Sequence, residues 1–133
     1  MKKVQYKLMN YEKAFLRLNQ ALLLETDNSI VIDGIIQRFE FTYELGWKLM
    51  KGYLEYEGLT EITTPRTTFQ EAYMVGLISK SEKWLSMIVD RNRTSHTYDE
   101  EMALQVCQRI KNEHIHTFEE LLCTMQAKVK KHE

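Results

Sequence analysis

The sequence has few of the residues that make tight turns or covalent cross-links. Its 133 residues include five glycines, one proline and two cysteines, a composition that favours long helices over many tight turns. Cys107 and Cys123 lie about 24 Å apart on one predicted helix, too far to form a disulfide. No apolar run approaches the roughly 20 residues that a membrane-spanning helix needs, and the first residues lack the pattern of a signal peptide. We therefore expect a cytoplasmic protein that does not enter a membrane.

Charge of one sign and metal-binding motifs are also scarce. The formal net charge is −1, so no strong overall field would attract nucleic acid or an anionic membrane. The sequence has no glycine-rich phosphate loop and no H-E-x-x-H. It also has no Asp-x-Asp pair, which argues against a magnesium-dependent nucleotidyltransferase. His114 and His116 would lie about 200° apart around a helix, His114 at the core edge and His116 on the surface. We expect neither a metal nor a cofactor.

Apolar residues recur at steps of three and four along most of the chain, and no segment alternates with a period of two. Hydrophobic residues make up 44% of the sequence and charged residues 28%, as in ordinary folded domains. Residues 1–133 are therefore predicted to form one all-α domain, an antiparallel up-and-down bundle of four main helices plus one short helix. The predicted helices cover approximately residues 2–24, 29–56, 65–76, 79–95 and 99–129.

Residues with capping chemistry mark the predicted ends of these helices. One of the residues 27–29 is expected to cap the second helix, and Gly58 is expected to end it. Pro65 suits the first position of the short helix. Three pairs have the spacing of a capping box, which starts a helix: Thr68 with Glu71, Ser79 with Glu82, and Thr97 with Glu100. The face that the fourth helix is expected to bury consists of Leu85, Ile88 and Val89, with Trp84 alongside.

The second predicted helix is the longest and the least amphipathic. Its apolar residues fall on two sides, and a helix that is apolar on more than one side must be covered on more than one side. This pattern suggests a central helix that also reaches a subunit interface, and therefore a homodimer. One side includes Ile35, Phe39 and Tyr43, and the other includes Phe41, Leu45 and Leu49.

Three charged residues of the same helix, Glu40, Glu44 and Lys48, follow one another at intervals of four. Residues with this spacing are neighbours on the helix surface, so opposite charges can pair there. We interpret the row as a solvated set of ion pairs with a small effect on stability. The alternative, in which one of the carboxylates belongs to a functional site, is retained.

The stretch DRNRTSHTYDE, residues 90–100, concentrates polar groups without glycine or proline. In a continuous helix, Arg91 and His96 would lie about 140° apart around the axis, so they converge only if the helix ends near residues 94–95. The capping pair that starts at Thr97 predicts such a break. Asn92, four residues before His96, could then orient the imidazole, and Arg93 adds a second fixed cation. The amides of the new helix N-terminus would also favour an anion.

These groups suit phosphoryl chemistry without a metal. His96 could take a proton from a ribose 2′-hydroxyl while Arg91 stabilises the charge that builds on the phosphorus oxygens. The neighbouring positive charge should lower the pKa of His96 and favour the neutral base at pH 7. The residue types alone are also compatible with a polar junction between two helices that contains a capping histidine.

Two segments resemble a known family. RNRTSH, residues 91–96, matches the R-x4-H motif of HEPN domains, with Asn92 in its usual place after the arginine, and RNRTSHTY resembles the R-x4-H-x-Y motif of HepT-type toxins, which adds Tyr98. QRFEFTYELGWKLMKGYLEYEG, residues 37–58, resembles the second helix of nucleotidyltransferase substrate-binding subunits. These proteins are a HEPN subgroup that is usually encoded beside a small MNT-type nucleotidyltransferase. The resemblance covers essentially the whole chain.

The resemblance implies a helical bundle that dimerises so that both motifs face a shared cleft. It also implies a toxin-like, metal-independent endoribonuclease with Arg91 and His96 in the catalytic roles. In HepT-type pairs the partner nucleotidyltransferase adenylylates the tyrosine of the motif, here Tyr98. The name of the subgroup implies an alternative, a non-catalytic subunit that binds RNA or a nucleotide and presents substrate to the nucleotidyltransferase. A third interpretation is a purely structural dimer with an empty cleft.

Overall fold

The computed structural model describes residues 1–96 and 99–132, without the side chains of residues 95 and 96. All regular elements in these ranges are helices, so the predicted all-α bundle is confirmed. None of the described helices combines the length and the apolar character needed to cross a membrane. The elements are α1 (Lys2–Ala21), α2 (Ser29–Tyr56), α3 (Pro65–Met74), α4 (Ser81–His96), α5 (Glu100–Arg109), the π-helical segment η1 (Ile110–His114) and α6 (Ile115–Lys131).

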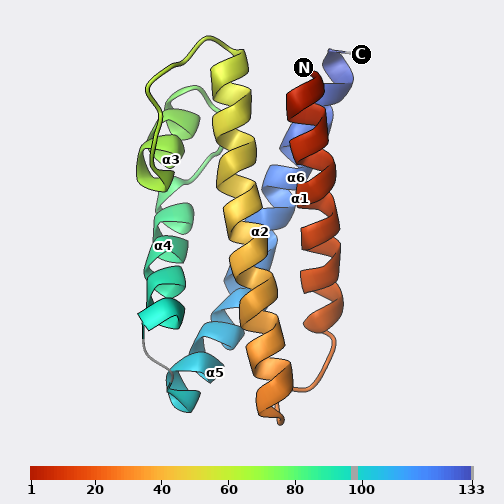
Figure 1. Ribbon diagram of the computed structural model, residues 1–133, viewed down its shortest axis with the longest axis vertical. Coiled ribbons are helices and arrows are strands. Elements are labelled where there is room, and N and C mark those ends of the chain that lie inside the picture. The colour runs from red at the N-terminus through yellow and green to blue at the C-terminus, as the bar shows by residue number, and fades with distance from the viewer. Residues whose placement is uncertain (97–98, 133) are drawn as a thin grey trace.

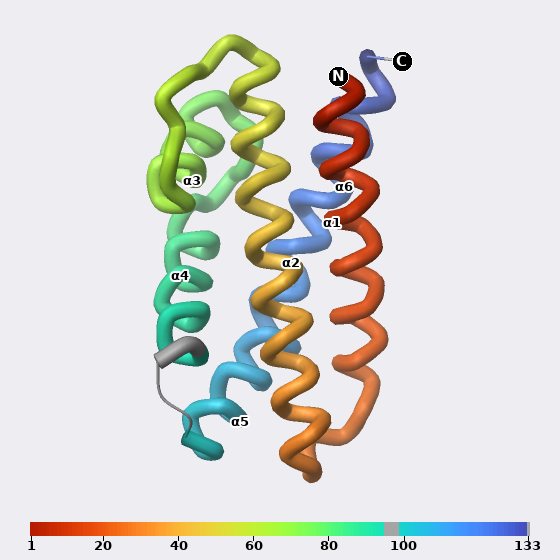
Figure 2. The backbone as a smooth tube through the Cα atoms, viewed as in Figure 1, coloured from red at the N-terminus to blue at the C-terminus, as the bar shows by residue number. Residues whose placement is uncertain are grey.

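The long helix α2 occupies the centre of the bundle. It packs against α1, α3, α4, α5 and α6, and Figure 1 shows α1 and α4 on opposite sides of it. The chain after α4 turns back and passes behind α2 as α5 and α6, so that the two termini lie at the same end of the bundle (Figure 2). A helix so placed must be apolar on several sides, which explains its weak amphipathic pattern.

Aromatic rings fill the middle of the core. Trp84 from α4 lies between Phe69 of α3 and Phe118 of α6, at ring-centroid distances of 5.1 and 5.7 Å. Phe39 of α2 contacts Phe118 from the other side at 5.9 Å. The hydroxyl of Tyr11 donates to the carbonyl oxygen of Phe118 over 2.7 Å, which satisfies a buried polar group. This cluster links α1, α2, α3, α4 and α6 near the start of α4.

The predicted ends of α2 and the place of Pro65 at the start of α3 are confirmed, whereas the capping pairs that begin at Thr68 and Ser79 are wrong. Asn28 caps α2 by accepting from the amide of Ile30, and Gly58 follows the helix with a φ of +97°. The short helix is capped by Thr64, whose hydroxyl accepts from the amide of Thr67. Thr68, predicted as the cap, is buried and donates to the carbonyl of Thr64. Similarly, α4 begins at Ser81, because the hydroxyl of Ser79 donates to Glu120 of α6 instead.

The buried face of α4 also differs from the prediction. Trp84, Met87 and Asp90 are buried, whereas Val89 is 50% exposed. The large ring of Trp84 enters the aromatic cluster and fixes the rotation of the helix about its axis, because it buries more apolar surface than any aliphatic neighbour. The rotation matters for the motif, since it turns Asp90 inward immediately before Arg91.

Candidate functional site

The helix that carries the R-x4-H motif does not break where the sequence predicted. α4 continues to His96, and Thr94 is still part of it, with its hydroxyl donating to the carbonyl of Arg91 over 3.0 Å. On an unbroken helix, positions 91 and 96 remain about 140° apart around the axis and about 7.5 Å apart along it. The predicted helix end at residues 94–95 is therefore wrong, since α4 runs through both residues.

The next helix starts two residues later than the predicted capping pair requires. Asp99 is the N-cap of α5, and its Oδ1 accepts from the amides of Glu101 and Met102 over 2.9 and 3.3 Å. An aspartate is a strong N-cap, and its charge also favours the positive end of the helix dipole. Thr97 and Tyr98 lie outside the described residues, as does the side chain of His96.

Arg91 extends from α4 towards two carboxylates of α2. Its Nη1 lies 3.1 Å from Oε2 of Glu40, and its Nε lies 3.9 Å from Oε1 of Glu44. The Thr94 hydroxyl, which donates to the carbonyl of Arg91, lies 3.4 Å from the same Oε2 of Glu40. The Arg91 side chain is 30% exposed, so it is anchored against α2 while part of its surface still faces solvent. The two carboxylates thus hold the Arg91 guanidinium, a group whose donors match the oxygens of a phosphate, in a fixed position.

The charged row Glu40, Glu44 and Lys48 on α2 is thus only partly the solvated set of ion pairs that the sequence suggested. Glu44 and Lys48 form the expected exposed pair, with an N–O distance of 3.9 Å, but Glu40 pairs with Arg91. The second oxygen of Glu44 accepts from the indole Nε1 of Trp47 over 3.0 Å. Burial and then the charge of Glu44 raise the pKa of Tyr43 to about 12, with Arg91 opposing the shift. The alternative, in which one of these carboxylates belongs to a functional site, stays a prediction.

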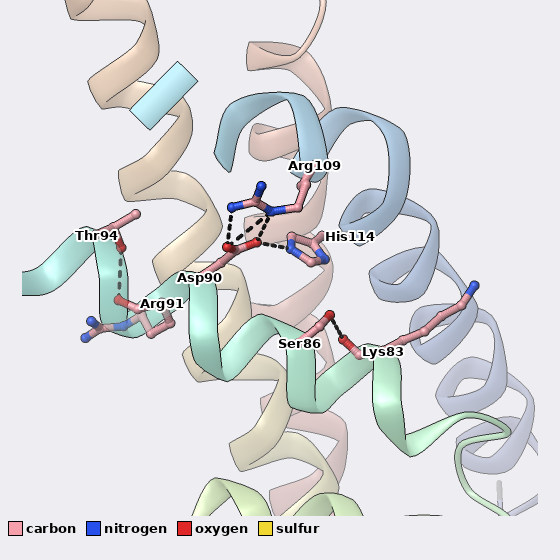
Figure 3. Close-up of polar contacts among 7 residues, drawn as sticks. All are labelled: Lys83, Ser86, Asp90, Arg91, Thr94, Arg109 and His114. Atoms are coloured by element: carbon pink, nitrogen blue, oxygen red, sulfur yellow. Dashed lines mark hydrogen bonds and ion pairs between the residues drawn. The ribbon is translucent and has the colours of Figure 1, made fainter. Parts of the chain in front are cut away.

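A second, buried charge cluster lies on the other side of α4, one residue before Arg91 (Figure 3). The guanidinium of Arg109 donates two hydrogen bonds to the Asp90 carboxylate, from Nε to Oδ2 over 2.9 Å and from Nη2 to Oδ1 over 2.6 Å. His114 Nε2 lies 2.7 Å from Oδ2. Asp90 and His114 are each only 3% exposed. Burial raises the pKa of Asp90, but hydrogen bonds with His114 and Arg109 and the charge of Arg109 outweigh it and lower the pKa to about 2.

The π-helical segment η1 explains how Arg109 and His114 reach the same carboxylate. Residues five apart diverge on an α-helix, whereas the wider i→i+5 turn of a π-helix aligns them. The imidazole of His114 also stacks on Phe39 of α2, with centroids 5.4 Å apart. Sequence reasoning placed His114 correctly at the core edge and His116 on the surface, but it missed the cluster. The one signal for it in the sequence was the spacing of Asp90, which lies three residues after Met87 and six after Trp84, the residues that α4 buries.

The remaining predicted residues lie on the surface. Asn92 and Arg93 are exposed on α4. A small groove of about 180 Å³ between α2 and α5 is lined by Glu40, Thr94 and Asp99, among others. Within the described part of the chain, no three His, Cys, Asp or Glu residues are placed to hold a metal ion. The chemistry that the described groups offer is charge stabilisation by Arg91.

A helical bundle whose fourth helix ends in an R-x4-H motif has the features of a HEPN-type protein. Residues 6–127 match the family model described as nucleotidyltransferase substrate binding protein like. The chain therefore belongs to this HepT-like family of HEPN proteins.

Three relatives illustrate the similarity. The probable ribonuclease HepT of Haemophilus influenzae is 37% identical, over 74% of this chain and 78% of its own length. A Haemophilus influenzae structure, described as the fold of a substrate binding domain of a nucleotidyltransferase, is 32% identical and superposes with a TM-score of 0.79 over 90% of this chain and 98% of that one. The Shewanella oneidensis HEPN toxin, tri-AMPylated and in complex with an MNT antitoxin, shares the fold at 18% identity, with a TM-score of 0.79 over 93% and 96%.

Proposed function

We propose that the chain is a toxin-like, metal-independent endoribonuclease that uses Arg91 and His96. The observation that carries the proposal is the complete R-x4-H motif in a chain 37% identical to a probable ribonuclease HepT. The anchoring of Arg91 between the two α2 carboxylates supports it, because a preorganised cation stabilises developing charge better than a mobile one.

The proposed reaction is transesterification within the RNA strand. His96 takes the proton of a ribose 2′-hydroxyl, and the resulting oxygen attacks the adjacent phosphorus atom. The bond from phosphorus to the 5′-oxygen breaks, this oxygen takes up a proton, and a 2′,3′-cyclic phosphate remains. Arg91 donates to the phosphorus oxygens as their negative charge increases. Asn92 and Arg93 are supporting residues that orient the imidazole and add positive charge.

We further propose that the active form is a homodimer in which both motifs face a shared cleft. The course of α4 supports this, because its backbone stays helical from Arg91 to His96 and so places these two positions about 140° apart around the axis. A cleft between two copies allows Arg91 of one copy to act with His96 of the other.

The function is tested by incubating the purified protein with tRNA and mRNA in the presence of EDTA. We expect cleavage that is unchanged by the chelator and leaves 2′,3′-cyclic phosphate ends, because the proposed proton transfers need no metal. A control incubation with added Mg²⁺ should give the same rate. An intact RNA panel, or cleavage that requires Mg²⁺, would contradict the proposed mechanism.

Regulation is proposed to come from an MNT-type nucleotidyltransferase encoded nearby, which adenylylates Tyr98. The phenolic oxygen would attack the α-phosphorus of ATP, losing its proton and releasing pyrophosphate. Support comes from the tri-AMPylated state of the Shewanella oneidensis toxin in its complex with an MNT antitoxin. A bulky, anionic nucleotide two residues from His96 would obstruct the cleft and offset the charge of Arg91.

Incubation with the neighbouring nucleotidyltransferase, ATP and Mg²⁺ is expected to label Tyr98, as mapped by mass spectrometry of proteolytic peptides. The labelled protein should lose its RNA cleavage. Tyr98→Phe, which lacks only the hydroxyl, is expected to remain unlabelled and active. Labelling at another residue, or none, would remove this regulation while leaving the ribonuclease proposal in place.

A second candidate is a non-catalytic subunit that binds RNA or a nucleotide and presents substrate to the nucleotidyltransferase. The description of the matching family and of the 32% identical Haemophilus influenzae structure favours it. This function predicts a stable complex with the neighbouring nucleotidyltransferase and no loss of RNA when the protein is alone. Failure of the two proteins to co-purify would count against it.

A further inference from the structure

Positive charge is concentrated on α1, although the chain as a whole is slightly acidic. This helix has five basic residues and one acidic residue, a net charge of +4 in a chain whose net charge is −1. Such asymmetry between parts of a chain is a sign of an anionic partner, even where the total charge is near zero. The position of these residues on the helix decides whether they form one surface.

A groove of about 580 Å³ runs between α1 and α2. Its cations are Lys13 and Arg17 from α1 and Arg38 from α2, and among the described residues that line it none is acidic. The floor includes the small residues Ala14 and Gly34, which leave space above the backbone. The groove therefore combines a hollow with positive charge from both of its walls.

The basic surface continues along the junction of the two helices. A Cβ atom placed on Gly52 of α2 would lie 3.1 Å from Cδ of Lys7, so the stem of Lys7 packs against α2 at this glycine. Lys7 and Arg17 are ten residues apart on α1, a length of about 15 Å. Positive charge thus follows the helix junction over a distance that suits several groups of a linear polyanion better than one small anion.

These cations are not neutralised by neighbouring acids. Across residues 1–96 and 99–132, the groups within 4.0 Å of a carboxylate are Lys48, Arg91, Arg109 and His114, and none of these ion pairs involves Lys7, Lys13, Arg17 or Arg38. Arg38 Nη1 instead donates to the main-chain oxygen of Arg17 over 2.7 Å, which holds the guanidinium at the groove. Uncompensated charge that is held in place favours an anionic ligand.

Phe41 adds the second chemical feature of the groove. It lies on the side of α2 for which the sequence suggested a subunit interface, and it lines the groove with 58% of its surface exposed, so its ring is accessible to a ligand in a single protomer. An exposed aromatic ring beside a row of cations is the combination with which proteins bind single-stranded nucleic acid, by base stacking and phosphate contacts. We propose that the groove between α1 and α2 binds single-stranded RNA, with Lys7, Lys13, Arg17 and Arg38 on the phosphates and Phe41 against a base.

The groove adjoins the surroundings of Arg91. Gln37 lines it and also lines the smaller groove that contains Glu40 and Thr94, and both of these residues contact the Arg91 side chain or its carbonyl. The smaller groove is acidic, since Asp33 and Glu40 line it as well. Arg91 pairs with Glu40 and offsets part of this negative charge, so a strand that leaves the basic groove is expected to pass over Gln37 to reach Arg91. The proposal rests on the ribonuclease function and assigns the surface that holds its substrate.

The test measures binding separately from cleavage. The probe is a fluorescent single-stranded 2′-O-methyl oligoribonucleotide, which lacks the hydroxyl that attacks phosphorus, and its anisotropy is followed with the full-length protein at several salt concentrations. Lys13→Glu/Arg17→Glu is expected to weaken binding at least tenfold and to reduce the slope of log K against log salt by about 1.4, since each lost phosphate contact accounts for about 0.7. Phe41→Ala is expected to weaken binding about tenfold with little change in slope.

The matched control is Lys130→Glu/Lys131→Glu, which makes the same change of net charge on exposed residues of α6. Thermal unfolding establishes that each variant is folded.

Equal losses of RNA affinity in the groove and control variants, or no RNA binding by the wild-type protein, would overturn the proposed RNA-binding groove. If the groove variants cleave RNA with an unchanged KM, the groove proposal is also overturned, but the ribonuclease proposal stands. Groove-dependent binding without any cleavage would support the groove and contradict the ribonuclease. Loss of nucleotidyltransferase binding with unchanged RNA binding would identify a protein interface instead.

Discussion

His96→Ala is expected to lower the rate of RNA cleavage about 10²–10⁴-fold, the usual contribution of a general base. Without the imidazole, the 2′-hydroxyl keeps its proton and is a poor nucleophile at pH 7. Arg91→Ala is expected to cost about 10²–10³-fold, because the charge on the phosphorus oxygens loses a preorganised donor. Single-turnover cleavage of a labelled RNA in EDTA measures both rates.

His116→Ala is the matched control, since His116 is an exposed histidine on α6 that is not part of the motif. It should cut RNA at the wild-type rate. An equal loss in His116→Ala and His96→Ala, or an undiminished rate in His96→Ala, would contradict the assigned role.

A mixture of the two inactive variants tests the shared cleft. A heterodimer of Arg91→Ala and His96→Ala chains contains one cleft with an intact arginine from one chain and an intact histidine from the other. If the catalytic pair is formed between copies, mixing should restore part of the activity, whereas each variant alone stays inactive. If the pair forms within one copy, no heterodimer has an intact site and mixing restores nothing. The unbroken α4 leads us to expect restoration.

The long helices were predictable because their signals are local. The bounds predicted for α2 agree with the structure because Asn28 and Gly58 act on the backbone within a few residues of themselves. The face that α4 buries was not predictable in this way. Leu85 and Val89 satisfy an apolar pattern as well as Met87 does, and the choice between them is made by Trp84, which packs on rings from α3 and α6.

The motif residues could be selected from the sequence, but their surroundings could not. Glu40 lies four residues before Glu44, the spacing of an exposed row of ion pairs on a helix. Only the packing of α4 on α2 brings Arg91 to Glu40. The end of α4 was misplaced because two capping signals overlap, and Asp99 prevails over the pair that begins at Thr97. The cluster around Asp90 depends on a π-turn, which has no distinctive residue pattern.

Asp90→Asn is expected to destabilise the fold by about 3–5 kcal/mol, the usual cost of removing one member of a buried ion pair. The substitution keeps the size of the side chain but removes the charge that Arg109 and the buried His114 share. Since the cluster fixes α4 to α5 and η1 one residue before Arg91, RNA cleavage should fall as well. Urea unfolding at pH 7, followed by circular dichroism, measures the free energy.

Asp33→Asn provides the matched control, because Asp33 is an exposed aspartate on α2. Surface substitutions of this kind change stability by about 0.5 kcal/mol or less. If Asp90→Asn unfolds with the same free energy as Asp33→Asn, the cluster does not stabilise the protein and cannot be what holds the motif helix in place.

The same carboxylate should leave a signature in the pH dependence of unfolding. The pKa of Asp90 is lowered from its ordinary value of 3.8 to about 2, so the folded chain binds its proton less readily than the unfolded chain does. The stability that this difference supplies, about 2 kcal/mol, is present above pH 4 and is lost as the pH falls through 2. The gap in unfolding free energy between the wild-type protein and Asp90→Asn should therefore narrow from pH 4 to pH 2. A gap that stays constant over this range would mean that the Asp90 carboxylate is not the group whose charge the cluster stabilises.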